Sequence, residues 1–250
     1  MSPPDPTQTD RARSGRVGDA VGREAVDREA VDSVAGRAAV HAALGEEVRL
    51  AIVEDLAVSD RSPTELAERF SIPTNLLAHH LDVLEQVGLI ERFTSAGDRR
   101  RRYVRLLRAP LHALGLGGGL GLTAPPPGGR VLFVCSHNSA RSQLAAALWA
   151  TRTGGVAASA GTHPAERVHP GAVAAAMRAG LDLRGAEPRL LEAGDDADLV
   201  VTVCDQAHEE LDPAPGWWHW SLPDPVSDGR AAAFDAVITE LDDRIRAVTN

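Results

Sequence analysis

The sequence has no lysine, only two cysteines and an aromatic share of 4%. Two cysteines, without a Cys-x-x-Cys spacing, are too few for the disulfide framework of a small secreted protein. No stretch approaches the roughly 18–20 apolar residues of a membrane span, and the first residues lack the apolar core of a secretory signal. We therefore expect a cytoplasmic protein with reduced thiols, no membrane association and an aliphatic core.

The charge balance is acidic, with 35 acidic against 26 basic residues and a net charge of −9 over 250 residues. A protein of this charge does not coat nucleic acid generally, although the total is compatible with a local basic patch. The length suits two ordinary domains. An apolar content of 44% is sufficient for a core in each of them.

The first half of the chain has the pattern of a winged helix-turn-helix. Residues 1–33 are polar and contain a tandem Arg-Glu-Ala-Val-Asp repeat, which predicts a disordered tail. Residues 34–108 predict two helices, then a third that starts at the capping box of Ser62 and Glu65, then a fourth and a β-hairpin with its turn at Gly97. The apolar face of the fourth helix is expected to contain Leu76, Leu77, Leu81, Leu84 and Val87.

The hairpin is basic although the protein is acidic. Residues 91–108 contain seven arginines against two acidic residues, a net charge of +5. Such a wing suits contact with DNA phosphates, and the alternative is a solvated hairpin edge that its charges protect from pairing. The candidate DNA contacts are Thr74, Asn75, His79, His80, Arg99, Arg100, Arg101 and Arg102.

Residues 109–129 are rich in glycine, proline and leucine and predict a linker. Beyond it, residues 130–250 alternate short apolar runs with helical stretches. Strands are expected at 130–135, 156–161, 198–204 and 217–222, and helices after the first strand and at 170–179, 188–193 and 231–248. This alternation predicts an α/β fold with a doubly wound parallel sheet, whose sites lie at the carboxyl ends of its strands.

The strongest motif is Cys135-x5-Arg141-Ser142, at the end of the first of these strands. A tight loop between a strand and a helix points its backbone N–H groups at one place and can bind a tetrahedral oxyanion there. Arg141 can form a fork to two of the oxygens, Ser142 can donate to a Cys135 thiolate, and Asn138 can hold the loop in shape. A buried structural cysteine beside an incidental arginine is the alternative. The expected substrate contacts are Ser136, His137, Asn138, Ser139, Ala140 and Arg141; no metal site or bound cofactor is predicted.

The segments CSHNSARSQLAAALW, SAGTHP, VVTVC and HWSLPDP resemble the low-molecular-weight phosphatase family, in particular its arsenate reductase branch. The resemblance covers about residues 129–250 and implies a four-stranded parallel sheet flanked by helices, with Cys135 as the nucleophile that attacks arsenate. Residues 36–108 resemble, more generically, ArsR-type winged-helix repressors, which implies a transcription regulator. That half contains no cysteine, which excludes thiolate sensing within it. A C-terminal dimer helix is not evident, so a homodimer stays open.

The reaction requires a general acid, because a displaced oxygen must leave as water or hydroxide. In the resembled family the acid belongs to an Asp-Pro pair, which assigns the role to Asp224, followed by Pro225. The alternative is an Asp-Pro pair that only forms a turn. Phosphotyrosine-specific members place aromatic residues just after this pair. Val226 follows here, which favours a small inorganic oxyanion.

Cys204 ends the third expected strand and matches the second of the three cysteines that thioredoxin-coupled members use. The third is expected near Leu211 and is missing, so a disulfide could not pass to the surface. The resemblance therefore favours an external thiol, mycothiol or glutathione, with a glutaredoxin-type protein, over thioredoxin. The missing lysine indicates a high-GC coding bias and, through it, mycothiol. A Cys135–Cys204 disulfide and a purely structural Cys204 are the alternatives.

Three functions remain in competition. The leading one is a DNA-binding regulator domain fused to an arsenate reductase. The second is a low-molecular-weight tyrosine phosphatase, and the third is a non-catalytic regulator that senses an oxyanion or the thiol redox state. Sensing alone needs no general acid. The sequence contains Asp224 in addition to Cys135 and Arg141, and this favours catalysis.

Overall fold

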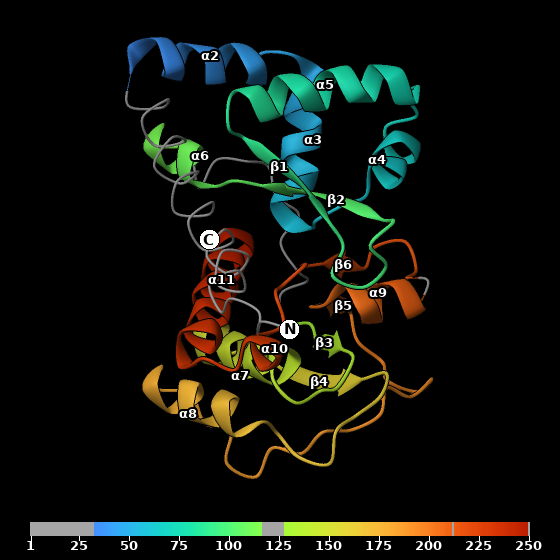
Figure 1. The fold of residues 1–250 in the computed structure, drawn as a ribbon, viewed down its shortest axis with the longest axis vertical. Helices are drawn as coiled ribbons and strands as arrows, with labels where there is room; N and C mark the ends of the chain where they lie inside the picture. Colours follow the sequence, from blue (N-terminus) through green and yellow to red (C-terminus); the bar gives the residue numbers. More distant parts are fainter. Residues whose placement is uncertain (1–32, 117–127, 212, 250) are drawn as a thin grey trace, which may run out of the picture.

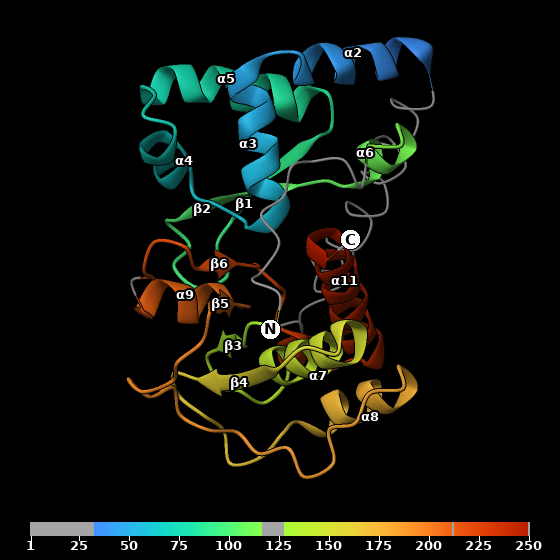
Figure 2. The same ribbon diagram turned by 180° about the vertical axis from the view of Figure 1, so that it is seen from behind.

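The computed structural model describes residues 33–116, 128–211 and 213–249. The tandem repeat and the middle of the expected linker lie outside the described residues. A mainly helical domain stands above an α/β domain in Figure 1, and Figure 2 gives the reverse view. None of the described helices is long and apolar enough to cross a membrane.

The N-terminal domain has the element order of a winged helix-turn-helix. Its elements are α2 (Val34–Leu44), α3 (Glu47–Val58), α4 (Pro63–Arg69), α5 (Thr74–Gln86), β1 (Ile90–Thr94) and β2 (Arg102–Leu106). Helix α4 begins at the predicted capping box, in which the Glu65 N–H donates to Ser62 Oγ and the Ser62 N–H donates to the Glu65 carboxylate. Strands β1 and β2 pair antiparallel. The turn between them, residues 95–101, is called the wing tip below.

The buried face of α5 differs from the expected one. It follows the helical spacing i, i+3, i+4, i+7 and contains Leu77, His80, Leu81 and Leu84. Leu76 was wrongly placed on it and is 41% exposed, because its side chain points about a quarter of a turn away. His80 was wrongly expected to face DNA. Its ring is buried, and its Nδ1 lies 3.5 Å from the carboxylate of Glu46.

The C-terminal domain is the expected α/β fold. Its elements are β3 (Val131–Cys135), α7 (Arg141–Thr153), β4 (Ala157–Gly161), α8 (Pro170–Arg178), β5 (Leu199–Thr202), α9 (Asp205–Leu211), β6 (Trp218–His219), α10 (Pro225–Asp228) and α11 (Ala231–Thr249). All four strands are parallel, in the order β4-β3-β5-β6. Helix α9 lies on the other side of the sheet from α7 and α11 in both views (Figures 1 and 2). Two-sided cover explains why every residue of β3 and β5 is buried.

Several segments differ from the sequence-based prediction. The expected strand 217–222 is reduced to the two residues of β6, and α9 had not been predicted. A short helix, α6 (Ala109–Ala113), stands at the start of the expected linker and buries Leu111 in the N-terminal core. These two helices and α10, which had not been predicted either, are short, so their sequences carry little periodicity and their formation depends on packing.

The helix predicted at 188–193 is not formed. Its backbone groups are used elsewhere: Gly161 N–H donates to the carbonyl of Arg189, and Leu191 N–H donates to the carbonyl of Gly161. Leu190 thereby forms a parallel bridge to Gly161 at the edge of the sheet. A helix would need the same groups for its own hydrogen bonds.

The residues between α3 and α4 join the two domains. Arg61 pairs with Val104 of β2 through both backbone hydrogen bonds, and the Asp60 N–H donates to the carbonyl of His219 in β6. The Asp60 carboxylate forms a 3.1 Å ion pair with Arg244 of α11, and both side chains are only 1% exposed. The domains therefore share a buried, hydrogen-bonded interface, which the sequence did not predict.

Candidate active site

The loop between β3 and α7, residues 136–140, is called the anion loop below. Cys135 ends β3, and its Sγ lies 3.0 Å from the Oγ of Ser142 in the first turn of α7. The Asn138 amide donates to the same Oγ at 2.8 Å. Because that oxygen accepts from Asn138, its own hydrogen is free to point at the sulfur and stabilise a thiolate.

Asn138 determines the shape of the loop. Its φ of 46° is left-handed, a conformation that asparagine tolerates better than most residues. The Arg189 N–H donates to its Oδ1 at 2.9 Å, and the Gln143 amide donates to its carbonyl at 3.1 Å. Sequence reasoning missed the parts that Gln143 and Arg189 play. Helical spacing alone does not show that the Gln143 side chain turns back onto the loop. It also does not show that residues 188–193 contact the loop through Arg189.

Arg141 and Asp224 face each other across the mouth of the site. Their nearest side-chain atoms are 3.3 Å apart, and Arg141 Nη1 also donates to the Leu222 carbonyl at 3.2 Å. Partial burial acts to raise the pKa of Asp224. A 2.5 Å hydrogen bond from Ser227 and the charge of Arg141 outweigh it and hold the pKa below that of an ordinary aspartate. Asp224 is therefore ionised at neutral pH.

Cys204 lies behind the anion loop. Its Sγ accepts hydrogen bonds from the Ser136 N–H at 3.2 Å and from the Ala207 N–H at 3.4 Å. Burial raises the pKa of Cys204 to about 12, although the charge of Arg141 opposes this shift. Cys204 is thus a protonated thiol at neutral pH. Both cysteines are free and buried.

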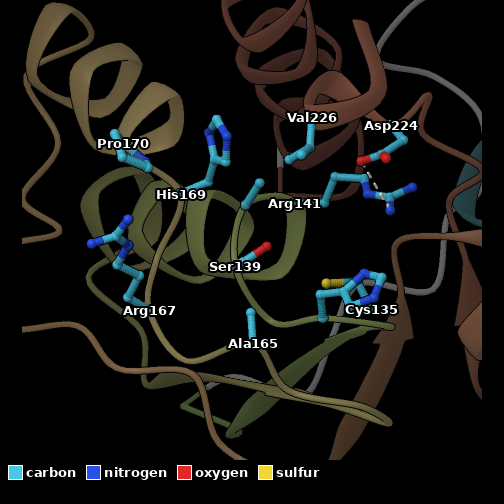
Figure 3. A pocket seen from close by; sticks show the side chains of 11 residues that line it. Cys135, Ser139, Arg141, Ala165, Arg167, His169, Pro170, Asp224 and Val226 are labelled. Atoms are coloured by element: carbon cyan, nitrogen blue, oxygen red, sulfur yellow. Dashed lines mark ion pairs between the residues drawn. The ribbon is translucent and has the colours of Figure 1, made fainter. Parts of the chain in front are cut away.

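Cys135 opens into a pocket of about 520 Å³. Its lining residues are Cys135, His137, Ser139, Ala140, Arg141, Ala165, Arg167, His169, Pro170, Asp224 and Val226. In Figure 3, Cys135, Arg141 and Asp224 lie on one side, and Arg167 and Pro170 lie on the other. A tetrahedral oxyanion fills only a small part of this volume, so the pocket has room for a second reactant.

The predicted site residues separate into two groups. His137, Ser139, Ala140, Arg141 and Asp224 line the pocket with Cys135, whereas Ser136, Asn138, Ser142 and Cys204 are buried around it without lining it. Sequence reasoning missed the loop between β4 and α8, which contributes Ala165, Arg167 and His169. One signal was available: this loop follows the carboxyl end of the predicted strand 156–161, and sites in such sheets lie at the carboxyl ends of the strands, where Cys135 also lies.

The other DNA-contact candidates lie on α5 and in the hairpin. Thr74, Asn75 and His79 are exposed on α5. The four hairpin arginines, 99–102, are exposed as well, and Arg100 pairs with Asp98. Their accessibility is compatible with contact to a phosphate backbone, and contact itself stays a prediction.

Comparison with known proteins finds a family match in each half of the chain. Residues 130–250 match the family described as low molecular weight phosphotyrosine protein phosphatase, and residues 44–92 match a helix-turn-helix domain. The glutaredoxin arsenate reductase of Synechocystis sp. is 31% identical over 126 residues, which cover 46% of this chain and 92% of that protein. The arsenate reductase of Bacillus subtilis is 30% identical over 129 residues, which cover 46% and 91%. The crystal structure of an arsenate reductase from Archaeoglobus fulgidus is similar at 31% identity and a TM-score of 0.41, covering 46% of this chain and 95% of that one.

Proposed function

The chain belongs to the low-molecular-weight phosphatase family through residues 130–250, and we propose that it reduces arsenate to arsenite with an external thiol. The observation that carries the proposal is that Cys135, Arg141 and Asp224 line one open pocket. The Cys135 sulfur contacts the Ser142 hydroxyl, and Arg141 pairs with Asp224. The arsenate reductases among its relatives support this substrate.

In the first step the Cys135 thiolate attacks arsenic(V), and an arsenic–oxygen bond breaks. The backbone N–H groups of the anion loop and the Arg141 guanidinium hold the negative charge. Asp224 protonates the departing oxygen, which leaves as water. An arsenate that engages Arg141 weakens the Arg141–Asp224 pair and adds negative charge beside the carboxylate. Both changes oppose the effect by which Arg141 lowers the pKa of Asp224, so that the carboxyl can hold the proton.

In the second step an external thiolate attacks the sulfur of Cys135. A mixed disulfide forms, the arsenic–sulfur bonding pair passes to arsenic, and arsenic(III) leaves as arsenite. A redoxin then reduces the mixed disulfide and restores Cys135. Cys204 is unsuited to the attack because it does not line the pocket and its pKa is about 12. The thiol is proposed to be mycothiol or glutathione, with a glutaredoxin-type partner, in the reducing cytoplasm.

A tyrosine phosphatase is the second candidate, because the family includes phosphatases. A phosphotyrosine ring would need an apolar platform beside the nucleophile. Among the described lining residues there is no Phe, Tyr or Trp, and Val226 lines the pocket just after the Asp224-Pro225 pair. The third candidate is a non-catalytic sensor. A sensor needs no general acid, so the position of Asp224 in the pocket favours the reductase over it.

We further propose that the N-terminal domain is an ArsR-type DNA-binding regulator. The match of residues 44–92 to a helix-turn-helix domain supports DNA binding, and the exposed residues of α5 supply polar groups for it. The described domain contains no cysteine, so an inducer would have to act through other groups or through the enzyme domain.

The reductase proposal is tested by supplying the purified chain with arsenate and one of three donors: thioredoxin, glutathione with glutaredoxin, or mycothiol with mycoredoxin. Turnover is expected with a low-molecular-weight thiol, lost in Cys135→Ser and kept in Cys204→Ser. Loss in both variants would indicate an internal disulfide instead. No reduction with any donor, together with hydrolysis of an aryl phosphate, would replace the reductase by the phosphatase.

A further inference from the structure

The wing tip is bound by two carboxylates of the enzyme domain. The Ala96 N–H donates to Asp205 Oδ2, and the Asp98 N–H donates to Glu209 Oε2, each at 2.7 Å. The Ser95 hydroxyl donates to Glu209 Oε1, also at 2.7 Å. Asp205 and Glu209 lie one turn apart on α9, so one face of this helix satisfies three donors of the wing tip.

The fit between the wing tip and α9 is close. A Cβ on Gly97 would lie 2.6 Å from Glu209 Oε2 and 3.1 Å from the backbone nitrogen of Gln206. A side chain at position 97 would therefore displace the Glu209 carboxylate and crowd the α9 backbone, and glycine avoids both contacts. Burial acts to raise the pKa of Asp205, but hydrogen bonds and the charge of His219 lower it to about 2, so that Asp205 meets the wing tip as a carboxylate.

The donors of the wing tip are those that proteins use on DNA phosphates. Backbone N–H groups, a serine hydroxyl and nearby arginines fix a protein on the backbone of a duplex without reading its sequence. The wing tip has all three, because Arg99 and Arg101 are exposed beside its amides and have no acidic partner at ion-pair distance among the described residues. The carboxylate oxygens of α9 occupy the place that phosphate oxygens would take.

We propose that the wing tip is a phosphate-binding site for duplex DNA, and that Asp205 and Glu209 fill this site when the enzyme domain is docked. Helix α5 lies at the far end of its domain from α9 (Figures 1 and 2), and its residues Thr74, Asn75 and His79 are exposed in the docked state. DNA and the enzyme domain thus compete for the wing tip but not for α5. This inference rests on the DNA-binding part of the proposed function.

Glu209 and its neighbour Glu210 offer a matched pair of variants. Glu209→Gln removes one negative charge at the wing tip. Glu210→Gln removes the same charge from the same helix, but Glu210 contacts Thr162 and Gln206 rather than the wing tip. Both variants are made in the full chain. Arsenate reduction is measured for each to verify that the enzyme domain is intact.

The binding probe is a mixed-sequence DNA duplex of about 30 base pairs, roughly three helical turns. Its affinity is measured by fluorescence anisotropy over a series of salt concentrations, and release of the wing tip is measured by tryptic cleavage at Arg99–Arg102. Glu209→Gln is expected to be cleaved faster and to bind the duplex several-fold more tightly. The slope of log K against log salt should steepen by about 0.9 for each additional phosphate that the protein neutralises. Glu210→Gln should match the unmodified chain in both measurements, and adding Ser95→Ala to Glu209→Gln should weaken the binding again.

Two results would overturn the inference alone, given that the unmodified chain binds DNA. Faster cleavage with unchanged affinity and slope would mean that the wing tip does not take phosphate. Unchanged cleavage and unchanged affinity in Glu209→Gln would mean that the carboxylates do not hold the wing tip. If neither the unmodified chain nor any variant binds the duplex, DNA binding itself fails and the inference fails with it.

Discussion

Gly161 supports the anion loop although it does not line the pocket. It ends β4, pairs with Cys135 across the sheet, and receives the segment around Leu190 on its other side. A Cβ there would lie 2.7 Å from the Ser136 carbonyl oxygen and 3.0 Å from the Asn138 nitrogen. Both are backbone atoms of the anion loop, which would have to shift.

Gly161→Ala is therefore expected to lower kcat/KM for arsenate by about 100-fold, since a displacement of about 1 Å in a preorganised site has an effect of this size. Steady-state kinetics with the effective thiol donor measure the change, and circular dichroism checks that the fold is kept. Gly194→Ala is the control, because nothing lies within 4 Å of a Cβ at that position. Unchanged kcat/KM in Gly161→Ala would show that the anion loop tolerates the shift.

At the scale of elements, α9 connects more of the molecule than its seven residues suggest. It begins directly after Cys204, and the Cys204 sulfur accepts from the Ala207 N–H in its first turn. Asp205 at its start lies 3.1 Å from His219 Nε2 in β6 and also binds the wing tip. One short helix thus contacts the thiol site, the sheet and the other domain.

Asp205 makes stability depend on pH. Its pKa is about 2 in the folded protein, below that of an ordinary aspartate, so the folded state favours the ionised form. A lowered pKa contributes stability above the unfolded value of about 3.9, and this contribution is lost as the pH falls towards 2. The shift corresponds to about 2 kcal/mol.

Asp205→Asn should therefore lower the free energy of unfolding by about 2 kcal/mol at pH 7, and the difference from the unmodified chain should shrink between pH 4 and pH 2. Urea unfolding followed by tryptophan fluorescence at several pH values measures both effects. Asp196→Asn, at an exposed side chain, serves as the control. A difference that stays constant across this pH range would mean that ionisation of Asp205 is not its cause.

At the scale of the whole molecule, the two domains are held together by buried polar contacts. Asp60 accepts from Arg244 with one carboxylate oxygen and from the Ser221 N–H with the other. Arg244 also binds Glu240 on its own helix. Leaving one charge of such a buried set without its partner is strongly destabilising.

Asp60→Ala is expected to lower the free energy of unfolding by about 3–5 kcal/mol. Because the Asp60 carboxylate joins the domains, unfolding should also separate into two transitions, detected by calorimetry. Asp228→Ala removes the exposed pair with Arg230 and should leave the melting curve unchanged. A single transition at the original temperature in Asp60→Ala would mean that the Asp60 carboxylate is not what couples the domains.

The sequence by itself determined the features that depend on neighbouring residues. The capping box of α4, the strand, loop and helix around Cys135 and the antiparallel hairpin all follow from local hydrogen bonds and from periodicity. For the same reason the α/β class and the division of the chain into two domains could be predicted. The Asp-Pro pair that the resemblance singled out drew attention to Asp224, which lines the pocket; its role as the acid stays a prediction.

Only the tertiary structure decided which distant groups meet. The loop with Arg167 and His169 lines the same pocket as Cys135. Residues 188–193 are not helical, and the Arg189 N–H donates to Asn138 instead. His80 is buried because it lies on the face of α5 that packs against the core. The docking of the wing tip on α9 belongs to the same class. Contacts between residues far apart in the chain depend on how the elements pack, and the pattern of any single element does not contain that information.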